Sequence, residues 1–174
     1  MLNLYILGVL FYIFVCNLNR IMLVTINTDA SHCSFTKDAS YAFMVCCNAG
    51  VFKKSGRFSK KVDNAMFAEL MCIANALHFT RNHPDLWGIS KIIINTDCLN
   101  GIDMILRETK MTKKNKKYRQ VRGVITKYIG KYKGSEKIPV QFKHVKSHTN
   151  KTDGRSKAND WCDKQAKKER KICS

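Results

Sequence analysis

Hydrophobic and polar positions divide the first half of the chain into short apolar runs followed by one helical stripe. The runs at 21–28, 41–47 and 50–58 are short and rich in β-branched and aromatic residues, which predicts three strands, and 48–50 has the composition of a hairpin turn. From Met66, apolar residues recur at i, i+4, i+7, i+8 and i+11, which predicts a helix over 64–81. Three strands and a helix therefore open the predicted fold.

The second half alternates between strands and helices. The continuous apolar run at 91–96 is typical of a buried parallel strand, and a further strand is predicted at 140–145. Helices are predicted at 99–107, within 107–137 and at 155–168, with a polar loop over 147–154. This order of elements predicts an α/β fold around a mixed sheet.

The start of the chain differs in composition from the rest. Residues 1–16 are apolar and uncharged, whereas a strand opens at once at Met22. A transmembrane helix needs about 20 apolar residues, and a secretory signal needs a positive start and a cleavage site of small residues. We expect 1–20 to be a dispensable leader or a misassigned start, with a membrane anchor through 1–16 as the alternative. The remainder, 21–174, has the length of one domain.

The charge of the chain is strongly unbalanced, with 31 Lys and Arg against 13 Asp and Glu and a formal net charge of +18. This excess favours a polyanionic partner, either nucleic acid or an anionic membrane surface. It is concentrated in a basic segment over 107–137, where only Glu108 and Glu136 oppose the Lys and Arg side chains. The eight cysteines lack zinc-ligand spacing and several lie in apolar runs, so we expect a reducing compartment, the cytoplasm.

Several acidic residues lie where a solvated charge is not expected. The sequence Ile-Asn-Thr-Asp occurs twice, at 26–29 and 94–97, and each copy closes an apolar run with an aspartate. If the two strands are parallel neighbours, Asp29 and Asp97 lie about 5 Å apart at the carboxyl edge of the sheet, where open α/β sheets place their sites. The alternative is that each aspartate caps the turn or helix that follows it.

Two further acids extend this candidate site. Glu69 borders the buried face of the predicted helix, and Asp163 shares one face of the last helix with Asn159 and Ala166. A solvated edge residue and a charge near a helix N-terminus are the alternatives for these two. Four carboxylates without a Cys or His cluster suit two Mg²⁺ ions, or Mn²⁺, which activate water in phosphodiester hydrolysis. Together with the basic charge, they favour a nuclease.

These residues resemble the motifs of the type 1 ribonuclease H family from about Ile21 to Lys168. The matching pieces are the aspartate of the first strand, the Ala-Glu-Leu at 68–70 of the first helix, the Thr-Asp at 96–97, His148 in its loop, and Asn-x-x-x-Asp-x-x-Ala at 159–166. The resemblance implies an RNase H-like fold, with three antiparallel N-terminal strands, two parallel strands and flanking helices. Cys98 replaces the serine that commonly follows the second aspartate.

The resemblance also implies a reaction and its residues. Asp29, Glu69, Asp97 and Asp163 would hold two Mg²⁺ ions, and His148 would aid proton transfer or product release. The activity would be endonucleolytic hydrolysis of RNA in RNA–DNA hybrids, leaving 5′-phosphate and 3′-hydroxyl ends. The basic segment would act as the handle that grips the DNA strand. Nucleic-acid contacts are implied for Ser31, Asn64, Lys113, Lys114, Lys116, Lys117, Arg119, Arg122 and Asn159.

Three alternatives to this function remain open at the level of sequence. The first is an RNase H-fold nuclease that acts on DNA, and the second is a catalytically silent module that binds hybrids or duplex RNA. The third uses the basic surface, together with 1–16, for membrane attachment. We expect a monomer in the cytoplasm, or in the host cytoplasm if the protein is viral, with membrane association only if the leader is retained.

Overall fold

The computed structural model describes residues 22–86, 88–106, 116–130, 138–145 and 153–171. The predicted order of strands and helices is confirmed over these residues. The predicted leader lies outside them, and no helix within the described part of the chain is long and apolar enough to cross a membrane. The elements are β1 (Met22–His32), β2 (Ala39–Cys47), β3 (Gly50–Arg57), α2 (Ala65–Asn82), β4 (Ile89–Thr96), α3 (Leu99–Leu106), α4 (Lys116–Gly130), β5 (Val140–His144) and α5 (Gly154–Lys171).

The strands form one five-stranded mixed sheet in the order β3-β2-β1-β4-β5. The pairs β1–β2 and β2–β3 are antiparallel, whereas β1–β4 and β4–β5 are parallel. This confirms the predicted sheet of three antiparallel N-terminal strands plus two parallel ones. β1 therefore lies at the centre, between an antiparallel and a parallel neighbour.

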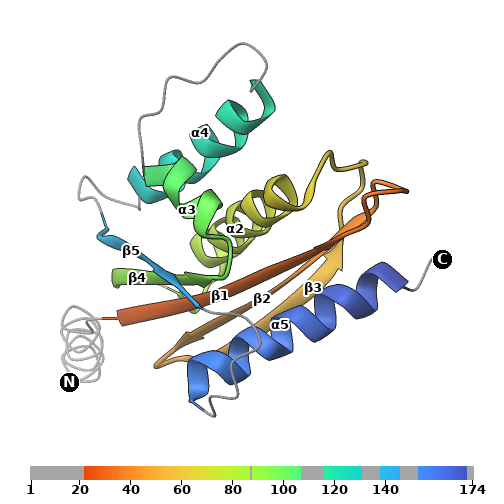
Figure 1. Ribbon diagram of the computed structural model, residues 1–174. Coiled ribbons are helices and arrows are strands. Elements are labelled where there is room, and N and C mark those ends of the chain that lie inside the picture. The colour runs from red at the N-terminus through yellow and green to blue at the C-terminus, as the bar shows by residue number, and fades with distance from the viewer. Residues whose placement is uncertain (1–21, 87, 107–115, 131–137, 146–152, 172–174) are drawn as a thin grey trace, which may run out of the picture.

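Helices cover both faces of the sheet (Figure 1). α2, α3 and α4 lie on one face, and α5 crosses the other face over β1, β2 and β3. The larger core lies under α2, where Leu70 and Ile73 pack against Ile26 and Ile94 of the central strands. A smaller core lies under α5, and most of its buried side chains are small: Ala42, Met44, Ala158, Cys162 and Ala166.

β1 is longer than its apolar run. The sequence predicts a strand that ends at Asp29, but β1 continues to His32 because β2 continues to pair with it, with Asp29 opposite Ala42 and His32 opposite Ala39. The expectation that Asp29 closes its strand is therefore wrong, although Asp97 does follow the last residue of β4. Asp29 is held by the backbone pairing of β2 on one side and is open to the end of β4 on the other.

α2 begins and ends where the sequence signals predict. The side chain of Asn64 accepts a hydrogen bond from the backbone N–H of Phe67 at 2.9 Å, which caps the first turn. His83 follows the last residue and donates its backbone N–H to the carbonyl of Phe79. The capped start fixes the first turns of α2, which carry Glu69 over the end of β1.

Candidate metal-binding active site

The two Ile-Asn-Thr-Asp copies pair in register. In the parallel pairing of β1 with β4, Ile26 lies opposite Ile94 and Asn27 opposite Asn95, the same positions of the two copies. The side-chain amide of Asn95 donates to Oδ1 of Asn27 at 2.9 Å, and both residues are almost completely buried. We call this pair the asparagine clamp. Each aspartate follows its asparagine by two residues, so the clamp joins the two strands just before the pair of carboxylates.

Three carboxylates converge at this edge of the sheet. One ligand oxygen from each of Asp29, Glu69 and Asp97 lies within 4.8 Å of the others. Asp29 comes from β1, Asp97 from the residue after β4, and Glu69 from the second turn of α2. The predicted proximity of Asp29 and Asp97 is therefore observed, and α2 adds the third acid from above the sheet.

Glu69 is held by one hydrogen bond and leaves one oxygen without a donor. Its Oε1 accepts the backbone N–H of Ala30 at 2.9 Å. Its Oε2 is buried and has no hydrogen-bond partner among the described residues. A buried carboxylate oxygen without a donor is costly, so this atom calls for a proton or a cation.

The electrostatics of the cluster point the same way. Burial, followed by the charges of Asp97 and Asp163, raises the pKa of Asp29 from 3.8 to about 7. Burial, followed by the charges of Asp29 and Asp97, holds the pKa of Glu69 well above its usual range. Without a cation, the chain must retain protons here or bear unscreened repulsion among buried carboxylates.

This donor set fits a divalent metal ion. A donor set of carboxylate oxygens, without sulfur or imidazole, suits Mg²⁺ and Mn²⁺, and the Oε2 of Glu69, which has no hydrogen-bond partner among the described residues, is available as a ligand. Asp29, Glu69 and Asp97 are the residues that would hold the ion. A bound ion would lower the pKa of a water molecule and stabilise charge on a phosphate oxygen.

Asp163, the fourth predicted ligand, lies outside this cluster of three. It is half-buried on α5. Its carboxylate forms an ion pair with Lys167 one turn away, with 2.7 Å between Oδ1 and Nζ. Its charge still reaches the site, because it raises the pKa of Asp29. The role of Asp163 as a ligand stays a prediction, and an ion there would have to compete with Lys167.

The predicted nucleic-acid contacts fall into three groups. Ser31 accepts the side-chain N–H of Arg170 at 2.8 Å, which joins the end of β1 to α5, and Asn159 is buried on α5 with an Oδ1 that lacks a partner among the described residues. Lys116, Lys117, Arg119 and Arg122 lie on α4. Outside the described residues are His148, Lys113 and Lys114.

Asn64 and Lys117 have structural partners that the sequence does not reveal. The hydroxyl of Tyr118 and the side chain of Asn64 lie at 2.6–2.9 Å, and Lys117 pairs with Asp63 at 2.8 Å. The ring of Phe67 also meets Tyr118 edge-on. α4 is thus fastened to the start of α2, close to the turn that carries Glu69. The nucleic-acid contacts of Asn64 and Lys117 stay predictions, and both side chains would have to make them in addition to the contacts described here.

The sequence identifies the family of this chain. Residues 22–171 match the RNase H family model, so the chain belongs to the RNase H family, as its motifs indicate. No curated protein matches the sequence significantly. The family assignment therefore rests on the family pattern as a whole and on the fold.

Solved structures show the same fold at low sequence identity. RNase H1 from the halophilic archaeon Halobacterium salinarum NRC-1 matches with a TM-score of 0.61 and 12% identity, covering 84% of this chain and 96% of that one. The N-terminal RNase H domain of rv2228c from Mycobacterium tuberculosis gives 0.55 and 14%, with 85% and 93% covered. LC11-RNase H1 in complex with an RNA/DNA hybrid gives 0.54 and 11%, with 83% and 97% covered.

Proposed function

We propose that this protein is a divalent-metal-dependent endoribonuclease that hydrolyses the RNA strand of RNA–DNA hybrids. The observation that carries the proposal is the convergence of Asp29, Glu69 and Asp97 at one edge of an RNase H-family fold. A protein that only binds nucleic acid gains nothing from buried carboxylates set against phosphates, because like charges repel. The cluster is therefore best explained by a metal and by the chemistry that it supports.

The chain's residues would serve this reaction in distinct ways. Asp29, Glu69 and Asp97 would bind metal, with Asp163 completing a site for two Mg²⁺ or Mn²⁺ ions after release from Lys167. The ions would supply an activated water for phosphodiester hydrolysis, which would leave 5′-phosphate and 3′-hydroxyl ends. His148 would move a proton or assist product release.

The charge of the chain supports the hybrid as partner. A net charge of +18 favours binding to a polyanion, and the similar LC11-RNase H1 was solved in complex with an RNA/DNA hybrid. Contacts to 2′-hydroxyl groups would select the RNA strand for cleavage. We propose a monomer acting in a reducing compartment such as the cytoplasm.

Calorimetric titration with Mg²⁺ separates this enzyme from a silent hybrid-binding module. We expect the full chain to bind Mg²⁺ and to lose that binding when Asp97 is replaced by asparagine. The exposed Asp160 offers a matched Asp160→Asn control, which should bind as the parent does. Absence of metal binding, or binding that survives the loss of Asp97, would favour the silent module.

The basic residues of α4 should contribute affinity that depends on salt. On α4, Lys116 is exposed and Arg122 half-exposed, and neither side chain makes a hydrogen bond or ion pair with a described residue. We expect the double variant Lys116→Gln/Arg122→Gln to bind hybrid more weakly, and the slope of log affinity against log salt to fall by about 1 for each lost phosphate contact. The exposed Lys91 on β4 serves as control, since Lys91→Gln should keep the parental slope. An unchanged slope in the double variant would remove α4 from the binding surface.

A further inference from the structure

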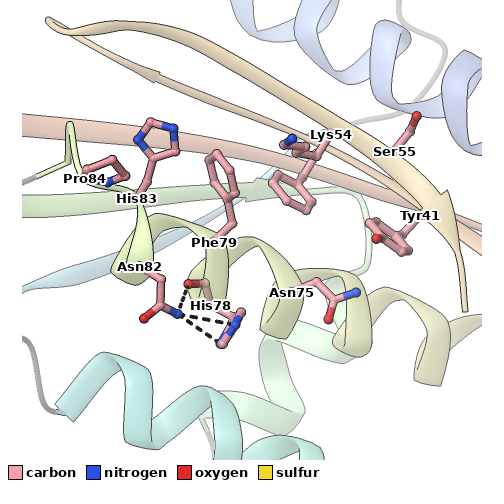
Figure 2. Close-up of a pocket in the computed structure, with 10 residues that line it drawn as sticks. Tyr41, Lys54, Ser55, Asn75, His78, Phe79, Asn82, His83 and Pro84 are labelled. Atoms are coloured by element: carbon pink, nitrogen blue, oxygen red, sulfur yellow. Dashed lines mark hydrogen bonds between the residues drawn. The ribbon is translucent and has the colours of Figure 1, made fainter.

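A cavity lies beside α2, away from the carboxylate cluster. It has a volume of about 470 Å³ and is formed by the C-terminal half of α2 together with β2 and β3 (Figure 2). This volume falls within the range of about 300–1,000 Å³ that is usual for small-molecule sites. The cavity shares a helix with Glu69 but none of its residues belongs to the cluster. Asn75, the nearest of them along α2, is about 9 Å further along the helix axis than Glu69.

Aromatic side chains form the floor of this cavity. Phe43 is buried, Tyr41 and Phe79 are half-buried, and the rings of Tyr41 and Phe43 stack at 6.1 Å. The His83 ring, which also lines the cavity, packs against Phe79 at 4.9 Å. Such a floor suits a flat aromatic ring, because stacking of a base on an aromatic side chain contributes about 1–3 kcal/mol.

Polar groups at the cavity lack partners. The hydroxyl of Tyr41 and the carboxamide of Asn75 make no hydrogen bond to any described residue, although both side chains are half-buried. By contrast, His78 is fixed by the hydroxyl of Tyr128 at 2.6 Å, and Asn82 donates to the carbonyl of His78 at 2.8 Å. Two of the polar side chains at the cavity are thus held by contacts within the protein, and two are available to bond the edge of a ligand.

The mouth of the cavity is positively charged. Lys54 of β3 has its ammonium 5.9 Å from the centre of the Phe79 ring, and none of the lining residues is acidic (Figure 2). Two acids contact lining residues: Glu169 accepts a hydrogen bond from the hydroxyl of Ser55, and Asp85 lies 3.8 Å from the ring of His83. An anionic group would therefore find Lys54 at the entrance, with the aromatic floor beyond it.

We propose that this cavity is a nucleotide-binding site, which takes the base of an unpaired nucleotide on its aromatic floor and the phosphate at Lys54. Tyr41 and Asn75 would bond the edge of the base. The proposal goes beyond cleavage, because binding here needs neither the metal nor the carboxylates. A free nucleotide and the unpaired end of a nucleic-acid strand present the same chemistry, and the experiment distinguishes them.

The test is an amide-resonance NMR titration of the full chain with AMP in EDTA, so that no metal can hold the phosphate at the carboxylates. We expect the amides of residues 75–83 to shift, and both Lys54→Ala and Asn75→Ala to bind AMP about tenfold more weakly. Tyr41→Phe removes only the hydroxyl and should weaken binding less. Lys91→Ala, an exposed lysine elsewhere, should bind as the parent does.

Two further probes define what would overturn the proposal. Adenosine should bind more weakly than AMP at the same amides, and inorganic phosphate should not reproduce the shifts. Equal shifts with phosphate alone would mean an anion site and not a nucleotide site. The absence of shifts at 75–83, or shifts that ignore Lys54 and Asn75, would refute the proposal outright. If a hybrid with an unpaired end displaces AMP and a blunt hybrid does not, the natural ligand is the end of a strand. If neither hybrid displaces AMP, the ligand is a free nucleotide.

Discussion

Replacing Asp29 by asparagine is expected to abolish cleavage and, at the same time, to stabilise the metal-free protein. Loss of a direct metal ligand should lower the cleavage rate by at least about a hundredfold, since even residues behind the ligands typically cost 10–100-fold. The same change removes a buried charge that is repelled by Asp97 and Asp163 and that raises the pKa of Glu69. We therefore expect the thermal midpoint of the metal-free variant at pH 8 to rise by at least roughly 2 °C.

The gain in stability should depend on pH in a definite direction. The Asp29 carboxyl holds its proton to about pH 7 in the folded chain but has an ordinary pKa of 3.8 when unfolded. Between these values the folded state binds more protons, so the stability of the parent without metal should fall as pH rises from about 4 to 7. Asp29→Asn should flatten this decline, and Mg²⁺ should oppose it in the parent. Asp160→Asn is the control at an exposed position. Retained cleavage, or a metal-free variant less stable than the parent at pH 8, would contradict this account.

Replacing one of the two residues of the asparagine clamp is expected to lower both the stability of the protein and its affinity for Mg²⁺. Asn95→Leu removes the donor to Oδ1 of Asn27. Because Asn27 is only 2% exposed, water cannot replace that donor. Such an orphaned group should lower the free energy of unfolding by about 1–3 kcal/mol, as measured by chemical denaturation. Because the clamp aligns the strands that carry Asp29 and Asp97, Mg²⁺ affinity should fall as well.

The double replacement makes this prediction specific. In Asn27→Leu/Asn95→Leu both partners are apolar, so most of the lost free energy of unfolding should return. The exposed Asn100 provides a matched control, and Asn100→Leu should change stability by no more than about 0.5 kcal/mol. If the double variant loses as much free energy of unfolding as Asn27→Leu and Asn95→Leu lose together, the hydrogen bond between the two asparagines does not explain the loss.

Much of the fold is readable from the sequence, because periodicity and strand composition mark each element to within a few residues. The repeated Ile-Asn-Thr-Asp also indicates that equivalent residues of the two strands could pair, as the two asparagines of the clamp do. The end of β1 is not readable, because nothing local to Asp29 shows that β2 continues to pair as far as His32. Pairing with a neighbouring strand, more than local composition, sets where this strand ends.

The candidate site can be predicted from the sequence only in part, because some of its contacts join residues far apart in the chain. Asp29, Glu69 and Asp97 stand out because carboxylates at strand ends and on a buried helix face are unusual. By contrast, the bond between Asn64 and Tyr118 joins residues 54 positions apart, and the pairing of Lys167 with Asp163 competes with a predicted ligand role. The cavity beside α2 is likewise formed by three separate elements, and no stretch of sequence marks it.

The most direct test of the proposed activity is cleavage of end-labelled substrates by the full chain with Mg²⁺ or Mn²⁺. RNA–DNA hybrid, duplex RNA and duplex DNA should be compared in parallel, beside the Asp29→Asn variant and an EDTA control. We expect cleavage of the RNA strand in the hybrid alone, lost in EDTA and in the variant. Binding of the hybrid without cleavage in either metal would contradict the enzyme, as would cleavage of duplex DNA in preference to the hybrid.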